Sequence, residues 1–542
     1  MVIYILVVYH YTYICRHGSA LCVACSPWWS HNSSQVQASS TDRPSFWHAM
    51  EPSCGSWPAS IAAALLAAVV IVRLLFPRAW SLLGTRSGTG REARLPAGSL
   101  GLPLLGETPA FIFAAYSPRP ESFVEKRSVL YGKVFKSHLW GSPAAVSTDP
   151  EVSRAVLQAD ASAFVPWYPR SLMELMGESS ILVLGGGLQR RVHGLAGAFF
   201  KSPQLKAKVT ADMQRRVGRA MDAWWKSGGG APTVRVQDEA KSIVFEILVR
   251  ALIGLDAGHK MQYLKQQFQE FMAGLISLPI KLPGTQLYRS LQAKKRMSRL
   301  IQKIIQEKRT KMILEEEGKH ERGTPSDLID VLLNNGSDEL TDQLISDNMI
   351  DFMIPAEDSV PVLITLAVKY LSDCPQEENM ELKRRKSDKG ETPEWTDYMS
   401  LTFTQHVITE TLRLGNIING IMQKAVRDVE VRGYLIPKGW RVLVYFRGVH
   451  LDAGVHEDPH AFNPWRWKDR ADMAVSSSSG FTPFGGGQRL CPGVDLARLE
   501  ASIFLHHLVT SFRWVAEEDT IVNFPTVRLK RGVPIAVTPK TT

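Results

Sequence analysis

Apolar residues recur at helical spacing through most of the chain beyond about residue 200. Positions three and four residues apart carry Leu, Ile, Val, Met and Phe, which places one face of each helix against a core. The amphipathic runs are residues 204–226, 238–255, 287–317 and 340–372. Shorter stretches with β-type composition occur at 134–138, 429–436 and 441–445. The pattern therefore predicts a mainly α-helical protein with small β-sheets.

A different pattern precedes this region. Residues 57–76 are continuously apolar apart from Ser60 and Arg73, and twenty helical residues span about 30 Å, the thickness of the hydrocarbon layer. Several arginines follow within about twenty residues, beginning at Arg78, which predicts a cytosolic body by the positive-inside rule. A cleaved signal peptide is the competing interpretation, but arginine stands where a small-residue cleavage site would be expected. We expect one N-terminal transmembrane helix in the endoplasmic reticulum membrane.

These patterns divide the chain into three parts. Residues 1–49 are unpatterned and Ser-rich, so we expect a disordered extension of doubtful relevance, with Met50 as the natural start. Residues 50–94 form the membrane anchor and basic linker. Residues 95–542 form one catalytic domain, which opens with a Pro/Gly-rich elbow at 95–106 that cannot be helical.

Composition and charge narrow the class of protein. Of 542 residues, 45% are hydrophobic and 21% charged, as in ordinary globular proteins. The net charge of +10 is spread thinly, which suits a membrane surface or an acidic partner and does not predict nucleic-acid binding. Four of the six cysteines lie in the first 54 residues, which excludes a disulfide-stapled main body. Cys22 and Cys25 have zinc-like spacing, but no second ligand pair follows them.

The most informative segment surrounds Cys491. A glycine run at 485–487 precedes it, and Pro492, a residue suited to the first position of a helix, follows it before a helical pattern begins. The position predicts a thiolate favoured by a helix N-terminus. The glycines allow a flat group to approach the backbone, and Arg489 can reach an anion on that group. This arrangement indicates an axial thiolate ligand to haem.

Five positions in this segment carry a family resemblance. Phe484, Gly487, Arg489, Cys491 and Gly493 match the pattern FxxGxRxCxG, and the chain resembles a cytochrome P-450, a haem-thiolate monooxygenase. The resemblance implies the cytochrome P-450 fold and haem b, with Cys491 as the iron ligand and the other four residues binding the cofactor.

A second motif lies upstream. Glu410 and Arg413 form an ExxR pair, which is common on helix surfaces and means little alone. With Arg466 in the run 462–467, it resembles the family's Glu–Arg–Arg triad. A buried carboxylate held by two guanidinium groups would fix the loop below the haem, so the implied role is structural.

The run 347–361 places acids and two prolines in an otherwise apolar helix. Pro361 has no N–H, so the Glu357 carbonyl loses its helical partner and the helix opens locally. The opened segment resembles the family's oxygen-binding motif. The resemblance assigns catalytic positions to Ala356, Asp358 and Ser359, where an acid and a hydroxyl would deliver protons to bound dioxygen.

Several positions depart from the family pattern. Ser359 replaces the usual Thr. At 189–193, Gln189 and His193 stand where many members carry other residues, which leaves Arg190 or Arg191 as a substitute propionate contact, with His193 as a further candidate. Gln423 stands where arginine is common. After Pro375, about six residues of a helix are missing relative to the family.

The substrate pocket is predicted from residues near these motifs. Apolar side chains would contact the substrate, and two asparagines could orient a hydroxyl group. The candidates are Phe352, Met353, Asn416, Ile417, Ile418, Asn419 and Ile421. Within the family, segments 411–421 and 164–176 resemble plant brassinosteroid enzymes of the steroid 23-hydroxylase group, also linked to C-3 oxidation. Ordinary core packing is the alternative interpretation of these side chains.

The resemblance implies a steroid hydroxylase or oxidase that uses O2. No flavin- or NADPH-binding segment is visible, so electrons from NADPH would come through a separate cytochrome P-450 reductase. Three alternatives stay open: a monooxygenase of another apolar terpenoid or sterol, a haem-thiolate isomerase or dehydratase that needs no O2, and a non-enzymatic haem sensor.

Overall fold

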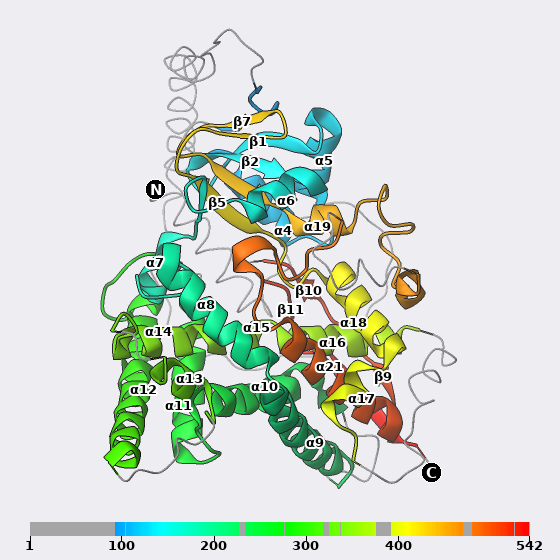
Figure 1. Ribbon diagram of the computed structural model, residues 1–542. Coiled ribbons are helices and arrows are strands. Elements are labelled where there is room, and N and C mark those ends of the chain that lie inside the picture. Colours follow the sequence, from blue (N-terminus) through cyan, green and yellow to red (C-terminus); the bar gives the residue numbers. More distant parts are fainter. Residues whose placement is uncertain are drawn as a thin grey trace, which may run out of the picture. The chain divides into compact units, whose positions relative to one another are not determined.

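The protein was examined as a computed structural model, shown in Figure 1. The described residues are 93–102, 105–226, 233–275, 277–317, 325–335, 338–374, 392–469, 480–524 and 526–540. The predicted anchor at 57–76, the first four cysteines and most of the segment after Pro375 lie outside them. Among the described residues, no helix is both long and apolar enough to cross a bilayer.

The long amphipathic runs form helices close to their predicted bounds. These are α9 (Pro203–Lys226), α10 (Val236–Ile253) and α12 (Gln286–Glu317). The fourth run is interrupted twice and forms α14 (Asp342–Met353), α15 (Pro355–Asp358) and α16 (Val360–Ser372). Ser359 lies between the last two with φ −122° and ψ −70°, because Pro361 cannot complete the helical hydrogen bond. The predicted local opening is therefore confirmed.

The remaining helices are shorter, and side-chain caps begin several of them. The Asp149 carboxylate accepts hydrogen bonds from the N–H groups of Glu151 and Val152, which satisfies donors left free at a helix start. The elements are α4 (Thr108–Ala115), α5 (Ser122–Tyr131), α6 (Pro150–Gln158), α7 (Arg170–Met176), α8 (Gly186–Lys201), α11 (His259–Met272), α13 (Leu328–Leu333), α17 (Trp395–Met399), α18 (Thr402–Gly415), α19 (Phe446–His450), α21 (Val494–Ser511) and the 3-10 turns η2 (Pro464–Trp467) and η3 (Gly487–Arg489).

The strands form small sheets, as predicted. The largest has the order β1-β2-β8-β5-β3, in which only the β2–β8 pair is parallel. Its strands are β1 (Val134–Leu139), β2 (Ser142–Ser147), β3 (Phe164–Pro166), β5 (Ile421–Ala425) and β8 (Arg441–Val444). The others pair as β4 (Thr233–Arg235), β12 (Pro534–Pro539) and β9 (Phe512–Ala516); β6 (Val429–Val431) with β7 (Tyr434–Ile436); and β10 (Ile521–Val522) with β11 (Arg528–Leu529).

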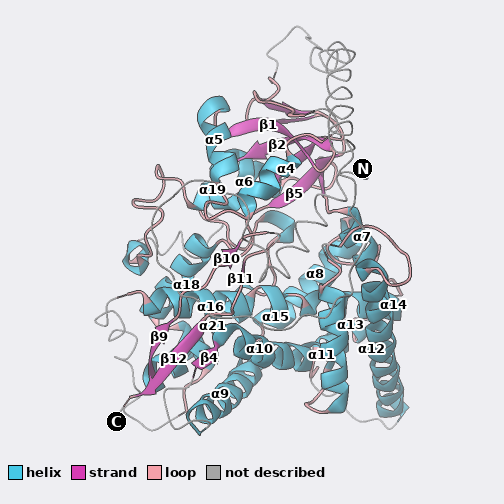
Figure 2. Cartoon of the chain, turned by 180° about the vertical axis from the view of Figure 1, so that it is seen from behind, coloured by secondary structure: helices cyan, strands magenta, loops and turns pink. Residues whose placement is uncertain are grey.

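The predicted strand at 429–436 is a hairpin. Arg432 and Gly433 both have positive φ, 50° and 83°, which is the turn geometry that a two-residue hairpin requires. The sheet with α4, α5 and α6 occupies one side of the domain, and α9 to α14 occupy the other, as Figures 1 and 2 show.

The main core lies among the helices. Buried side chains of α10, α16 and α21 form one continuous cluster, in which Ile364, Leu366, Ile503 and Phe504 have no exposed surface. Burying each such side chain stabilises the fold by roughly 1.5–3 kcal/mol. This packing fixes α16 and α21, which carry Ser359 and Cys491 at their N-terminal ends.

Candidate active site

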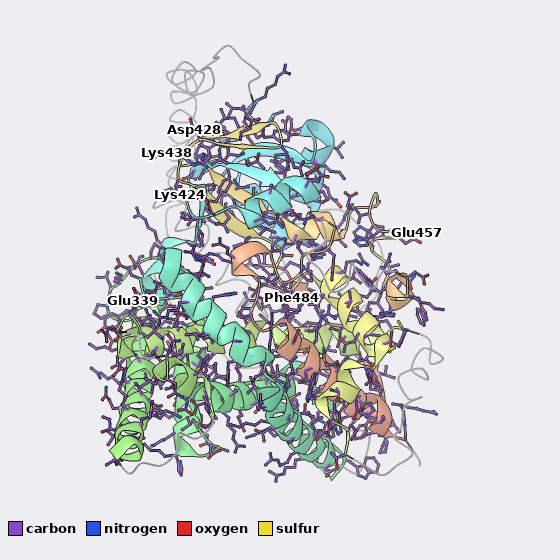
Figure 3. All side chains as sticks on the ribbon, in the orientation of Figure 1. Glu339, Lys424, Asp428, Lys438, Glu457 and Phe484 are labelled. Carbon is purple, nitrogen blue, oxygen red and sulfur yellow. The ribbon has the colours of Figure 1, made fainter. Side chains whose placement is uncertain are left out.

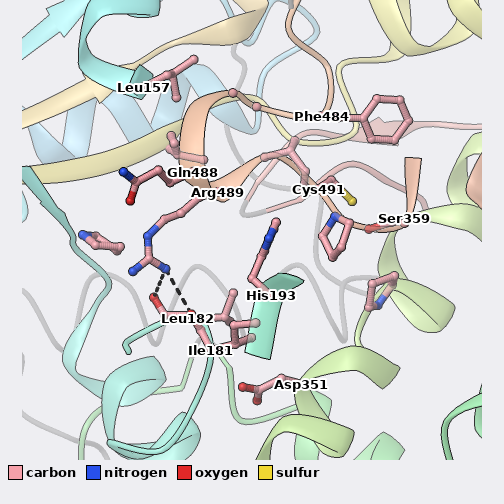
Figure 4. Close-up of a pocket in the computed structure, with 18 of the residues that line it drawn as sticks. Leu157, Ile181, Leu182, His193, Asp351, Ser359, Phe484, Gln488, Arg489 and Cys491 are labelled. Carbon is pink, nitrogen blue, oxygen red and sulfur yellow. Dashed lines mark hydrogen bonds between the residues drawn. The ribbon is translucent and has the colours of Figure 1, made fainter. Parts of the chain in front are cut away.

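A cavity of about 480 Å³ lies where five separated segments meet. Figure 4 shows residues that line it. They come from stretches near positions 156–168, 181–200, 351–363, 412–423 and 483–500. Most of the lining side chains are apolar, and Cys491, Ser359 and Asp351 are among the polar ones.

The Cys491 loop is held by its own backbone. The Cys491 N–H donates to the Phe484 carbonyl at 3.0 Å, which closes the glycine turn. Gly487 has φ 64°, and a Cβ there would lie 2.2 Å from the Leu157 carbonyl oxygen on α6. Only glycine fits this contact. Figure 3 shows Phe484 between the sheet side and the helical side of the domain, and it lines the cavity with Cys491.

Two details of this loop differ from the expectation. Helix α21 begins at Val494 with Gly493 as its N-cap, so Pro492 precedes the helix instead of starting it. Burial raises the pKa of the Cys491 thiol, and the Gly493 backbone N–H only partly offsets this. In the protein alone, desolvation thus outweighs the helix terminus that was predicted to favour thiolate. A metal cation at the sulfur would reverse this balance.

Arg489 connects the loop to the segment before α8, and His193 connects it to α8 itself. The Arg489 guanidinium donates to the carbonyls of Ile181 at 3.1 Å and Leu184. His193 Nε2 lies 2.8 Å from the Leu490 carbonyl, so that nitrogen carries the hydrogen. Both side chains line the cavity. Arg190 is exposed on α8 and is not among the residues lining the cavity, so its contact with the cofactor stays a prediction.

The residues at one end of the cavity fit haem. Gly485, Gly486 and Gly493 leave a wall without side chains beside Cys491. The side-chain amide nitrogen of Gln189 is buried without a hydrogen-bond partner among the described residues, and Gln189 lines the same cavity. The arrangement matches a metalloporphyrin. The sulfur can bind the metal, the glycine wall can accept the flat ring, and the hydrogen-bond donors can bind its carboxylate groups.

Glu410, Arg413 and Arg466 are brought together as the motif predicts. Arg413 donates to both Glu410 carboxylate oxygens, at 2.9 and 2.7 Å, and Arg466 donates to one at 2.9 Å. Sequence reasoning missed two further donors, the indole of Trp467 at 2.9 Å and the Asn463 backbone N–H at 3.0 Å. Both lie inside the motif already singled out. Burial tends to raise the pKa of Glu410, but Arg413 and its other partners hold it below the ordinary value.

The oxygen-motif residues separate in space. Ser359 lines the cavity. Ala356 is fully buried in the helical core. The Asp358 carboxylate accepts a hydrogen bond from the Thr526 hydroxyl at 3.4 Å, and burial raises its pKa. Asp358 ends α15, and its carboxylate faces Thr526, which precedes β11, so its role beside bound dioxygen stays a prediction.

The predicted substrate residues divide in the same way. Phe352, Ile417, Ile418 and Ile421 line the cavity. Met353, one position along from Phe352, points into the core with no exposed surface. Neither asparagine belongs to the cavity lining.

Both asparagines make hydrogen bonds elsewhere among the described residues. Asn416 ends α18 with φ 44°, accepts from His450 Nδ1 at 2.7 Å and donates to the Arg413 carbonyl at 2.7 Å. Asn419 donates to the Asn523 carbonyl at 2.6 Å. The Asn416 amide is therefore engaged on both sides, whereas the amide oxygen of Asn419 is buried without a hydrogen-bond partner among the described residues. Their role in orienting a hydroxyl group stays a prediction.

Several polar cavity residues were not predicted from the sequence, among them Gln488 and Glu500 of the Cys491 segment. Asp351 lies on α14, eight positions before Ser359, and Tyr168 follows β3. Both line the cavity. Both belong to segments that the sequence had marked as unusual, but only the spatial arrangement distinguishes them from their neighbours.

Comparison with known proteins gives a consistent result. The sequence profile of the Cytochrome P450 family matches residues 96–535. "Cytochrome P450 90D2" of Brachypodium distachyon is 73% identical over 492 residues, covering 89% of this chain and 94% of that protein. "3-epi-6-deoxocathasterone 23-monooxygenase CYP90D1" of Arabidopsis thaliana is 56% identical, covering 82% and 89%. The solved structure "Retinoic acid bound cyanobacterial CYP120A1" matches with a TM-score of 0.70 at 22% identity, covering 82% and 99%, which shows the shared fold.

Proposed function

The chain belongs to the cytochrome P450 family, and from this premise we propose that it hydroxylates a brassinosteroid precursor at C-23. It is a haem-thiolate monooxygenase related to steroid-modifying enzymes. The observation that carries the proposal is the apolar cavity containing both Cys491 and Ser359, in a chain 56% and 50% identical to two Arabidopsis thaliana proteins named as 23-monooxygenases.

Haem b, when bound, supplies the activation of dioxygen with two electrons. The Cys491 sulfur would hold the iron, and Arg489, His193 and Gln189 would hold the carboxylate edge. Ser359, which lines the same cavity, would hold a proton at its hydroxyl oxygen. The aliphatic wall formed by Ile417, Ile418 and Ile421 would exclude water and orient the steroid.

The net reaction converts the C–H bond, O2, NADPH and a proton into the alcohol, water and NADP⁺. A separate NADPH–cytochrome P450 reductase supplies the two electrons. The apolar segment 57–76 would anchor the protein in the endoplasmic reticulum membrane, with the catalytic domain in the cytosol. The roles assigned to Cys491, Ser359 and the haem-edge residues belong to this proposal.

A second candidate is oxidation at C-3. "3beta,22alpha-dihydroxysteroid 3-dehydrogenase" of Arabidopsis thaliana is 39% identical, covering 84% of this chain and 95% of that protein. The lower identity places this reaction behind C-23 hydroxylation. Hydroxylation of another sterol or terpenoid, and rearrangement without O2, are the outcomes that the test must separate.

The test is co-expression with the reductase in microsomes, followed by a carbon-monoxide difference spectrum and mass spectrometry of the products. We expect NADPH-dependent addition of one oxygen to 22-hydroxylated steroids, with the new hydroxyl at C-23 by fragmentation. Under ¹⁸O2, the new hydroxyl should carry the label. A ketone at C-3 would support the second candidate. Product formed without NADPH and O2 would overturn monooxygenation altogether.

A further inference from the structure

Asp351 is a buried acid in the wall of the substrate cavity. Only 6% of its surface is exposed, and it lines the cavity that also holds Cys491 and Ser359. Neither carboxylate oxygen makes a hydrogen bond of normal geometry with the residues that the structure describes, although the Ser180 hydroxyl and the Ile181 N–H lie close to it. Figure 4 shows the Asp351 carboxylate near Ile181, at some distance from the Cys491 sulfur. An unpaired buried carboxyl group is costly and calls for an explanation.

A structural role for Asp351 is already filled by other residues. The loop facing it is held by Asn348, one turn earlier on α14. Asn348 accepts from the Ile181 N–H at 2.9 Å and donates to the Ser179 carbonyl at 2.9 Å. The nearby cation, Lys294, pairs with Asp347 at 3.1 Å and also donates to a backbone carbonyl. The Asp351 carboxylate is therefore not needed to hold this loop or to pair with Lys294.

The pKa of Asp351 also indicates a carboxyl group without a fully compensating partner. Burial raises the pKa of Asp351 to about 7, and the Ser180 hydroxyl and Lys294 offset it only in part. Tyr168, which lines the same cavity, has its pKa raised mainly by burial; the charge of Arg489 lowers it and that of Asp351 adds a smaller increase. A carboxyl group near its midpoint can donate or accept a hydrogen bond, as a substrate hydroxyl also can.

We propose that Asp351 binds a hydroxyl group of the steroid at the end of the molecule opposite to the carbon that is oxidised. This inference rests on the proposed function. Eight residues separate Asp351 from Ser359, which in an unbroken helix would span about 12 Å, comparable to the length of a steroid ring system. The breaks at Ile354 and Ser359 interrupt this stretch, and both side chains still line the same cavity. The aliphatic cavity wall would contact the rings, and Asp351 would set the register along them.

The test compares Asp351→Leu with Asp351→Asn in the haem-loaded full-length protein. Met353→Leu is the control, because Met353 lies on the same helix but in the core. Each variant is titrated with a steroid that carries the ring hydroxyl and with its deoxy analogue, and the spectral shift of the haem measures the dissociation constant. We expect Asp351→Leu to weaken binding of the hydroxylated steroid roughly 10- to 100-fold, and binding of the deoxy analogue less than about threefold. Asp351→Asn should retain most of the affinity.

A stability measurement separates this role from a structural one. Removing an unpaired buried acid should leave the melting temperature of substrate-free Asp351→Leu unchanged or higher. Equal weakening of both steroids, or a lower melting temperature, would overturn the inference. Loss of haem from Asp351→Leu would also overturn it and would place Asp351 at the haem edge. If the wild type binds neither steroid, the proposed function itself fails.

Discussion

Replacing Glu410 by Ala removes the centre of a buried ionic network. Glu410 and Arg413 have no exposed side-chain surface, and that of Arg466 is 8% exposed. Glu410 accepts hydrogen bonds from both guanidinium groups, from the Trp467 indole and from the Asn463 backbone. Without it, two cations face each other in the interior.

The loss of stability in Glu410→Ala depends on which hydrogen-bond acceptors Arg413 still has. Arg413 keeps carbonyl acceptors on His450, Pro459 and Ala461, but no carboxylate. Breaking a buried pair in this way costs about 3–5 kcal/mol, a large part of the 5–15 kcal/mol that typically stabilises a domain. These carbonyls belong to the loop leading towards Cys491, so we expect Glu410→Ala to accumulate little haem-loaded protein.

The effect should depend on pH in a defined direction. The pKa of Glu410 in the folded protein lies below its ordinary value of 4.5, because its ionic partners outweigh burial. The stabilisation by ionised Glu410 is therefore complete above about pH 4.5 and is lost as the pH falls through the lower folded pKa. The wild type and Glu410→Ala should differ most near neutral pH and converge in acid.

The assay measures the 450 nm carbon-monoxide signal per total protein, together with urea denaturation. Glu410→Gln tests whether shape alone suffices and should fall between wild type and Glu410→Ala. Glu517→Ala is the matched surface control, because Glu517 and Arg531 form an exposed pair, 44% and 55% accessible, worth at most about 1 kcal/mol. A normal 450 nm signal with an unchanged urea midpoint for Glu410→Ala would refute the reasoning.

Three further predictions concern the loop, the proton path and the reductase. Gly487→Ala should abolish haem incorporation, because its Cβ would lie 2.2 Å from the Leu157 carbonyl oxygen. The control Gly197→Ala should bind haem normally, because its Cβ would lie 3.8 Å from the nearest atom. Equal 450 nm signals from the two variants would contradict this prediction. Ser359→Ala should raise peroxide release relative to product by about tenfold or more, and an unchanged peroxide-to-product ratio would exclude Ser359 from proton delivery. Raising salt from 50 to 500 mM should suppress reductase-supported turnover and leave peroxide-driven turnover unaffected, because charge attraction between proteins is screened; equal suppression of both would count against electrostatic docking.

The sequence was most informative where a local pattern dictates structure. The helices at 204–226 and 287–317 follow from apolar spacing, and the break at Pro361 follows from the missing N–H of proline. The hairpin at 432–433 was missed as a turn, because Arg-Gly is a weaker turn signal than Asn-Gly. Local rules succeed in these helices because their hydrogen bonds join residues four positions apart.

The direction of individual side chains was the feature least predictable from the sequence. Asp358 and Asn416 carry suitable groups near the right motifs, yet Asp358 bonds Thr526 and Asn416 bonds His450. A rotation of one residue along a helix turns a side chain by about 100°, and small breaks at Pro355 and Ser359 change which side faces the cavity.

By itself, the sequence determined the helical class, the cysteine loop and the ExxR pair, because glycine, proline and periodic apolar positions act over a few residues. Only the tertiary structure decided which polar groups are paired. Asn416, Asn419 and Asp358 bond within the described protein, whereas Asp351 faces the cavity unpaired. The partners of Asn419 and Asp358 lie more than a hundred positions away along the chain, and no local pattern encodes such pairing.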